Sequence, residues 1–249
     1  MKRYLMAVCI LLAALSSCSK DDEEMQPSSE QPGQSEVSFS YEQGIFLGVS
    51  LPYRKAAIGT AANGQSALVI YLHGGSNKGS DNTSQMNEAG IDSISNYLLA
   101  HGVKAVMLVP QCPADKSWGG QMNGVLKGLI DNYAKADSID ASHVYLFGGS
   151  MGGTGTWGMV SDYPGLLAAA MPVAGDPSRS NAQNVAQTPV YSVASKDDEV
   201  ITFSNVEDFI TKLGSLTNHF KFDAVTGWSH SDTCTKGYTA ERLAWVFGH

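Results

Sequence analysis

The clearest chemistry encoded in this sequence is that of an activated serine. Residues 148–152 read Gly-Gly-Ser-Met-Gly and fit the pattern G-x-S-x-G. The apolar run 144–147 precedes them and an amphipathic stretch follows, which predicts a sharp turn between a strand and a helix. Such a turn exposes the serine above a helix N-terminus, where developing negative charge is stabilised. We therefore interpret Ser150 as a nucleophile, the alternative being a glycine-rich turn with a capping serine.

A serine hydroxyl is a poor nucleophile unless a base takes its proton. The sequence holds six histidines. His230 lies in the turn-like segment 226–231, after the last expected strand, where the base is found in chains with the order Ser, Asp, His. We expect His230 to be the base, with an ordinary surface histidine as the alternative.

A third group should orient the imidazole and stabilise its charged form. The acidic loop Asp197-Asp198-Glu199 follows the expected strand 189–194 and lies between Ser150 and His230 in the chain. Three adjacent carboxylates cannot all be buried, so most of this loop must be solvated. The spacing alone leaves Asp197 and Asp198 as candidates.

Acyl transfer also needs hydrogen-bond donors for the negative oxygen of the transition state. One donor is expected to be the backbone N–H of Met151, directly after the serine. The other should come from the turn His73-Gly74-Gly75-Ser76 after the first central strand. We expect Gly75, with Ser76 as the alternative; a simple tight turn is the other interpretation.

The elements that must position these groups follow from alternating short apolar runs and longer amphipathic stretches. Strands are expected at 67–72, 103–109, 143–147, 168–173, 189–194 and 220–225, and helices at 82–100, 122–136, 152–163, 203–216 and 238–247. Strands that are apolar on both sides predict a mostly parallel sheet with helices on both faces. In such a sheet the active residues gather at the carboxyl ends of the strands.

Composition excludes several function classes. The 249 residues are 43% hydrophobic and 16% charged, which suits a folded α/β domain, and the net charge of −8 leaves no basic surplus for nucleic acid. The histidines and cysteines lack the spacings of metal sites, and no phosphate-binding or dinucleotide glycine motif is found. We expect neither a metal nor a cofactor.

The N-terminus is typical of a targeting segment. A basic head and the short apolar run 5–15 lead to Leu-Ser-Ser-Cys at 15–18, which resembles the bacterial lipobox. We expect a signal peptide at 1–17, lipidation of Cys18, an acidic and polar tether at 18–36, and a catalytic domain at 37–249. This predicts an extracytoplasmic protein anchored to a membrane, in the outer membrane or at the cell surface of a Gram-negative bacterium. The alternative is an ordinary secretory signal.

Taken together, these features resemble the α/β-hydrolase superfamily. The narrower resemblance is to a bacterial predicted-peptidase and carboxylesterase group, related to phospholipase/carboxylesterases and to feruloyl and acetyl-xylan esterases. It is carried by LPYR at 51–54, LHGG at 72–75, GSDN at 79–82, VPQCP…W at 109–118 and GGSMGG…GTW at 148–157. In the acid loop of this group the catalytic Asp stands three residues before a Val, which implies Asp197 before Val200. Two features depart from the group: Val193-Ala194 replaces the usual His-Gly, and Ile201 replaces a Pro.

The resemblance also bears on the substrate. The segment 174–188 is too short for the lid domain that many relatives insert there, so we expect an open cleft suited to esters on a polymer. Trp118 and Trp228 fall in loops at the catalytic edge and are expected to stack on a sugar or an aromatic acyl group, or else to pack as ordinary tryptophans. Cys112 and Cys234 lie at the same edge, and a disulfide between them is a further hypothesis.

The function expected from these features is serine ester hydrolysis outside the cytoplasm, removing feruloyl or acetyl groups from polysaccharide. A serine peptidase of the same fold is one alternative. A glycan-binding lipoprotein with a vestigial triad is another, although a binding module has no need of all three groups.

Overall fold

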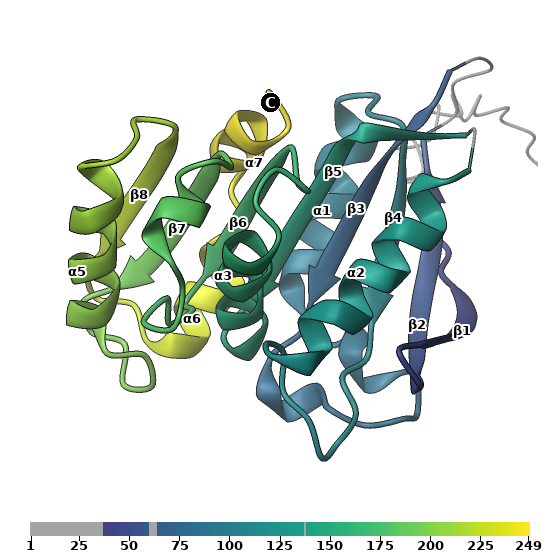
Figure 1. Ribbon diagram of the computed structural model, residues 1–249, viewed down its shortest axis with the longest axis horizontal. Coiled ribbons are helices and arrows are strands. Elements are labelled where there is room, and N and C mark those ends of the chain that lie inside the picture. The colour runs from purple at the N-terminus through teal and green to yellow at the C-terminus, as the bar shows by residue number, and fades with distance from the viewer. Residues whose placement is uncertain (1–36, 60–63, 137) are drawn as a thin grey trace, which may run out of the picture. The chain divides into compact units, whose positions relative to one another are not determined.

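The fold is built on one eight-stranded sheet, in the order β1-β2-β4-β3-β5-β6-β7-β8 (Figure 1). The computed structural model describes residues 37–59, 64–136 and 138–249, so the predicted signal peptide, Cys18 and tether lie outside the described residues. The strands are β1 (Ser40–Phe46), β2 (Val49–Ile58), β3 (Ser66–Leu72), β4 (Ala105–Pro110), β5 (Ile139–Gly149), β6 (Ala169–Val173), β7 (Val190–Ser195) and β8 (Phe220–Val225). β1 pairs antiparallel with β2, and β2 antiparallel with β4; every other pair is parallel.

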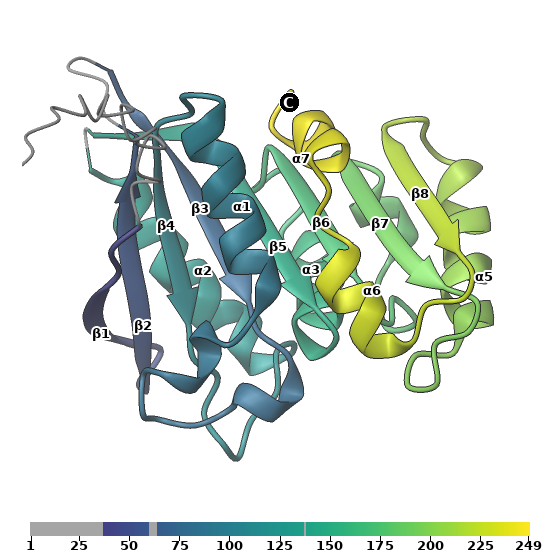
Figure 2. The same ribbon diagram turned by 180° about the vertical axis from the view of Figure 1, so that it is seen from behind.

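Helices cover both faces of this sheet. They are α1 (Ala89–Ala100), α2 (Gln121–Ala134), α3 (Met151–Asp162), α4 (Ala182–Val185), α5 (Phe203–Gly214), α6 (His230–Lys236) and α7 (Ala240–Val246). Helices α2, α3 and α5 lie on the face seen in Figure 1, and α1, α6 and α7 on the face seen in Figure 2. No described helix is long and apolar enough to cross a membrane.

Burial on both faces explains the sequence of the central strands. Every residue of β3 is buried, because one apolar core lies under α2 and α3 and a second lies under α1 and α7. At the edge of the sheet no residue of β8 is fully buried, which fits its mixture of polar and apolar residues.

The expected strands and helices are largely confirmed, with three differences. The hairpin of β1 and β2 extends the early strand well beyond the four residues singled out. The expected helix at 82–100 is a short 3-10 turn, η2 (Ser84–Met86), followed by α1. The segment expected as a loop around His230 is the start of α6, because Ser229 caps this helix and shares a capping box with Asp232.

Candidate active site

Ser150 occupies the sharp turn between β5 and α3. Its backbone has φ 58° and ψ −120°, a strained region for a residue with a side chain. The turn is held by its N–H, which donates to Val173 O at 3.0 Å. Two glycines allow the close approach that this turn needs: a Cβ on Gly148 would lie 2.4 Å from Gly152 O, and one on Gly152 only 1.9 Å from Leu72 O. The geometry therefore matches the predicted elbow.

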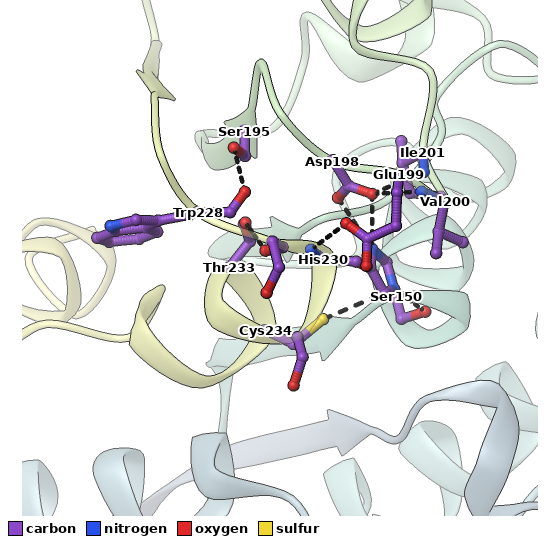
Figure 3. Close-up of polar contacts among 12 residues, drawn as sticks. Ser150, Ser195, Asp198, Glu199, Val200, Ile201, Trp228, His230, Thr233 and Cys234 are labelled. Atoms are coloured by element: carbon purple, nitrogen blue, oxygen red, sulfur yellow. Dashed lines mark hydrogen bonds and ion pairs between the residues drawn. The ribbon is translucent and has the colours of Figure 1, made fainter.

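His230 lies directly against this serine. Its Nε2 is 2.7 Å from Ser150 Oγ. Figure 3 shows the two side chains next to each other. As the first residue of α6 it also donates its backbone N–H to a carboxylate oxygen of Glu199, at 3.0 Å. The structure thus brings together the two residues predicted to be nucleophile and base.

The carboxylate that holds His230 belongs to Asp198. Its two oxygens lie 3.0 and 2.9 Å from Nδ1 of the histidine. The Asp198 side chain is only 2% exposed, and the N–H groups of Val200 and Ile201 both donate to its Oδ1, at 2.9 and 2.8 Å. A carboxylate accepts only, so Nδ1 carries the proton and Nε2 is free to accept one from Ser150.

The prediction of Asp197 as this group is wrong. Asp197 is exposed, and its Oδ2 accepts a hydrogen bond at 2.6 Å from the backbone N–H of Gly227. Neighbouring side chains in this tight loop point in different directions, so only one of the two aspartates can face the imidazole. Asp197 instead ties the acid loop to the loop that leads to His230.

The two expected oxyanion donors lie side by side. Gly75 is the first residue of a 3-10 turn, η1 (Gly75–Asn77), and Met151 is the first residue of α3, so neither N–H has an acceptor within its own helix. A Cβ on Gly75 would lie 4.0 Å from the Cβ of Met151, and one on Gly74 would lie 3.6 Å from the Cβ of Ser150. Both turns therefore border the serine.

Sequence reasoning missed Glu88, which organises this part of the site. Its Oε1 accepts hydrogen bonds from the backbone N–H of Gly74 at 2.7 Å and from Asn77 Nδ2 at 2.6 Å. Its Oε2 accepts from the hydroxyl of Tyr71 at 3.3 Å, and burial raises the pKa of that tyrosine well above its usual value. Glu88 belongs to no motif and stands 14 residues from Gly74, so spacing carried no signal for it.

His73 fixes the start of the same turn. Its side chain is fully buried, and burial lowers its pKa to about 4. The backbone N–H of Cys112 donates to its Nε2 at 2.9 Å, so the proton sits on Nδ1, which lies 2.6 Å from Gly74 O. A neutral imidazole therefore joins the turn after β3 to the loop after β4.

These groups open into a pocket of about 470 Å³. Most of the described residues that line it carry polar side chains, and Phe, Tyr and Trp are not among them. Val200, which is 61% exposed, provides an apolar contact at the rim. The polar residues around the serine and histidine are Ser76, Asn77, Asn87, Glu88, Ser231 and Thr235.

Neither tryptophan predicted to bind substrate lines this pocket. Trp118 is 4% exposed and donates its ring N–H to His73 O at 3.0 Å. Trp228 points away from Ser150 in Figure 3, and its ring is 5.8 Å from Lys236 Nζ and 5.9 Å from the Arg242 guanidinium. In the structure both rings pack against protein groups, and Trp118 also lines a separate hollow beside α3. Substrate binding by either tryptophan therefore stays a prediction.

The two cysteines of the described chain are free thiols, so the disulfide hypothesis is wrong. Cys112 is buried in the core under α2 and α3, whereas Cys234 packs in the core on the opposite face. The sheet separates them. Cys234 lies 4.0 Å from His230 Nε2, and burial raises the pKa of each thiol to about 12. Within the described ranges, no three His, Cys, Asp or Glu side chains are grouped to hold a metal.

No protein-family profile matches the chain. A bifunctional acetylxylan esterase/xylanase from Neocallimastix patriciarum is 32% identical over 82 residues, which is 33% of this chain and 12% of that protein. The chain thus spans only a small part of the length of this relative.

Solved structures match over most of the described chain. A thermostable esterase is 26% identical with a TM-score of 0.73, covering 84% of this chain and 62% of its own. A feruloyl esterase module from Clostridium thermocellum, solved with sinapinate, is 15% identical with a TM-score of 0.65, covering 85% and 88%. Peptidases are also among the matching structures. The chain has the α/β-hydrolase fold, and that prediction is confirmed.

Proposed function

We propose that this chain, with its α/β-hydrolase fold, is a serine hydrolase of carboxylic esters. The observation that carries the proposal is the continuous contact from Ser150 Oγ to His230 Nε2 at 2.7 Å and from His230 Nδ1 to both oxygens of Asp198. This is the geometry that acyl transfer through a covalent intermediate requires. The esterases among the similar proteins point to the same reaction class.

In the proposed mechanism, Ser150 Oγ attacks the ester carbonyl carbon while His230 Nε2 takes the hydroxyl proton. The buried Asp198 carboxylate stabilises the imidazolium that forms. The N–H groups of Gly75 and Met151 donate to the carbonyl oxygen as it becomes negative. The imidazolium then protonates the departing alcohol. His230 then takes a proton from water, whose oxygen attacks the acyl carbon. The histidine returns this proton to Ser150 Oγ as the acyl–serine bond breaks and the acid leaves.

The proposed substrate is an acetyl or feruloyl ester of a polysaccharide. Asparagine, glutamate and hydroxyl side chains around Ser150 suit a hydroxylated alcohol and a small acyl group. Val200 is an exposed apolar contact for a larger acyl group at the rim. The acetylxylan esterase and feruloyl esterase among the similar proteins support these two acyl groups.

The proposed setting is outside the cytoplasm. The lipobox-like Leu-Ser-Ser-Cys at 15–18 and the polar segment that follows support an enzyme tethered to a membrane through Cys18. Cell fractionation, followed by measurement of the protein in the soluble and membrane fractions, tests this. Recovery of the Cys18→Ser variant from a soluble fraction, with the wild type in membranes, is the expected result; equal partition of the two would contradict it.

Hydrolysis assays test the reaction class. The wild type is expected to hydrolyse acetylated xylan, methyl ferulate or both, and Ser150→Ala is expected to lose the activity by orders of magnitude while keeping its fold. A peptidase of the same fold would instead cleave peptide substrates and neither ester. A glycan-binding protein would hydrolyse nothing, and its serine would fail to react with a fluorophosphonate probe.

A further inference from the structure

A second hollow lies near the same edge of the sheet. It has a volume of about 450 Å³ and lies between the start of α2 with the loop before it, one side of α3 down to its last residue, and the loop after β6. Its polar walls are formed by Asn123, Thr154, Asp162, Asp176 and Arg179. None of these residues lines the pocket at Ser150.

One wall of the hollow is formed by α3, the helix that begins directly after Ser150. Ser150, Thr154, Gly158 and Asp162 recur every four residues, so they follow one side of α3. Thr154 donates its backbone N–H to Ser150 O at 3.0 Å and lies about 6 Å further along the helix axis. The lining therefore starts one turn from the serine.

Asn123 is the strongest sign that this hollow takes a ligand. Its side chain is buried, with the residue 1% exposed, and its Nδ2 donates to Asp162 Oδ2 at 2.7 Å. Since a carboxylate can only accept, the amide nitrogen must face Asp162. The amide oxygen is then left without a hydrogen-bond partner, although it is buried. Buried polar atoms are ordinarily paired, so this oxygen lacks a donor.

The charges around the hollow restrict what that donor can be. Asp162 and Asp176 contribute carboxylates, against the one cation, Arg179, among the residues that line it. Asp176 is held in place, because its backbone N–H donates to Thr154 Oγ1 at 2.9 Å. Two carboxylates against one guanidinium leave the lining with a net negative charge, so an anion would be repelled. A ligand with several hydroxyl groups can donate to the carboxylates and to Asn123, and can accept from Arg179.

We propose that this hollow binds a sugar unit of the polysaccharide whose ester is cleaved at Ser150. The proposal rests on the proposed function. A polymer held here would present esters to the serine at a raised local concentration, which a small ester cannot exploit. A cationic amine also suits two carboxylates, and it is the competing occupant that the test must separate.

Steady-state kinetics test the site by comparing kcat/KM on an oligosaccharide ester with kcat/KM on a small ester. Ser117→Trp fills the rim from an exposed position, and Arg179→Ala removes the cation. For each variant, the ratio of kcat/KM on acetylated xylo-oligosaccharide to kcat/KM on 4-nitrophenyl acetate is expected to fall about tenfold, through KM. The matched control Lys212→Ala, an exposed cation on α5 outside this hollow, is expected to leave the ratio unchanged. An unchanged ratio in both test variants would overturn the proposal.

Binding without turnover separates this proposal from the proposed function. Titration of unacetylated xylo-oligosaccharide into Ser150→Ala is expected to show binding that weakens at least tenfold when Ser117→Trp is added. If this binding is seen but the wild type hydrolyses no ester, the sugar site is supported and the proposed esterase function is overturned. If the wild type is active but adding Ser117→Trp leaves sugar binding by Ser150→Ala unchanged, the sugar site alone is overturned. If n-butylamine binds to Ser150→Ala and Ser117→Trp weakens that binding, while the sugar does not bind, the amine is the occupant and the proposal is overturned.

Discussion

Both carboxylate oxygens of Asp198 lie within hydrogen-bond distance of His230 Nδ1, at 3.0 and 2.9 Å. The adjacent Asp197 is directed instead to the backbone N–H of Gly227. One residue of difference in a turn therefore decides which carboxylate serves the histidine.

Replacing each aspartate should separate these roles. Asp198→Asn is expected to lower kcat on 4-nitrophenyl acetate by roughly 10³- to 10⁴-fold, because an amide can hold the imidazole in the wrong tautomer. Asp197→Asn is expected to change kcat by less than about threefold, since the Gly227 contact lies away from the reacting atoms. Equal losses in the two variants would show that the loop is rearranged in solution.

Glu88 is expected to act as a positioning residue for the oxyanion turn. Glu88→Ala removes the acceptor for Gly74 N–H and Asn77 Nδ2, so kcat should fall by about tenfold or more with a smaller change in KM. Glu88→Gln keeps an amide oxygen at this position and should recover most of kcat. Circular dichroism of both variants controls for folding, and a Gln variant as poor as Ala would show that the charge, rather than the hydrogen bonds, is what matters.

The thiols should be inert in the native protein. Burial raises the pKa of Cys112 and Cys234 to about 12, so at pH 8 only about one thiol in 10⁴ is ionised. Iodoacetamide at pH 8 is expected to leave the peptides containing these residues unmodified, and to label both fully in urea without reductant. Mass mapping that finds the two peptides joined in urea would show a disulfide that the structure does not have.

His73 should make stability depend on pH. Burial lowers its pKa in the folded state to about 4 from the usual 6.5, so between these values the unfolded chain binds the proton that the folded chain refuses. The free energy of unfolding is therefore expected to fall as pH drops from 6.5 to 4, by up to about 3 kcal/mol.

Urea unfolding at several pH values checks this dependence. His73→Gln should flatten the slope over this range whatever its absolute stability. Asp140, whose pKa the Ser142 hydroxyl lowers to about 2, contributes only at lower pH. A wild-type stability that stays constant from pH 6.5 to 4.5 would contradict a neutral, buried His73.

The sequence was sufficient to predict the turn at Ser150, the place of His230 after the last strand and most of the strands, because each follows from a local pattern. The strand–turn–helix signal around Ser150 and the alternation of apolar runs need no knowledge of distant contacts. The resemblance in the acid loop was not sufficient, because the choice between Asp197 and Asp198 depends on which side chain the turn directs inward.

Groups defined by long-range contacts escaped prediction. Glu88 and Asn123 belong to no motif, and their hydrogen-bond partners are set by how α1 and α2 pack rather than by spacing. The two tryptophans were placed correctly at the edge loops, but burial and cation contacts, not chain position, determine where their rings point. The cysteines show the same limit, since sequence cannot tell which face of the sheet each thiol joins.

The 1.9 Å that would separate a Cβ on Gly152 from Leu72 O means that the end of β3 and the first turn of α3 share a wall with no free space. The proposed oxyanion donors, Gly75 and Met151, and the hydroxyl of Ser150 directly follow the end of β3 or lie at the start of α3. They cannot drift independently, so evolution or design cannot alter one without moving the others. Changes in substrate preference must therefore be made in the surrounding loops, at 78–87, 113–120 and 176–181, where side chains can vary while the reacting centre keeps its dimensions.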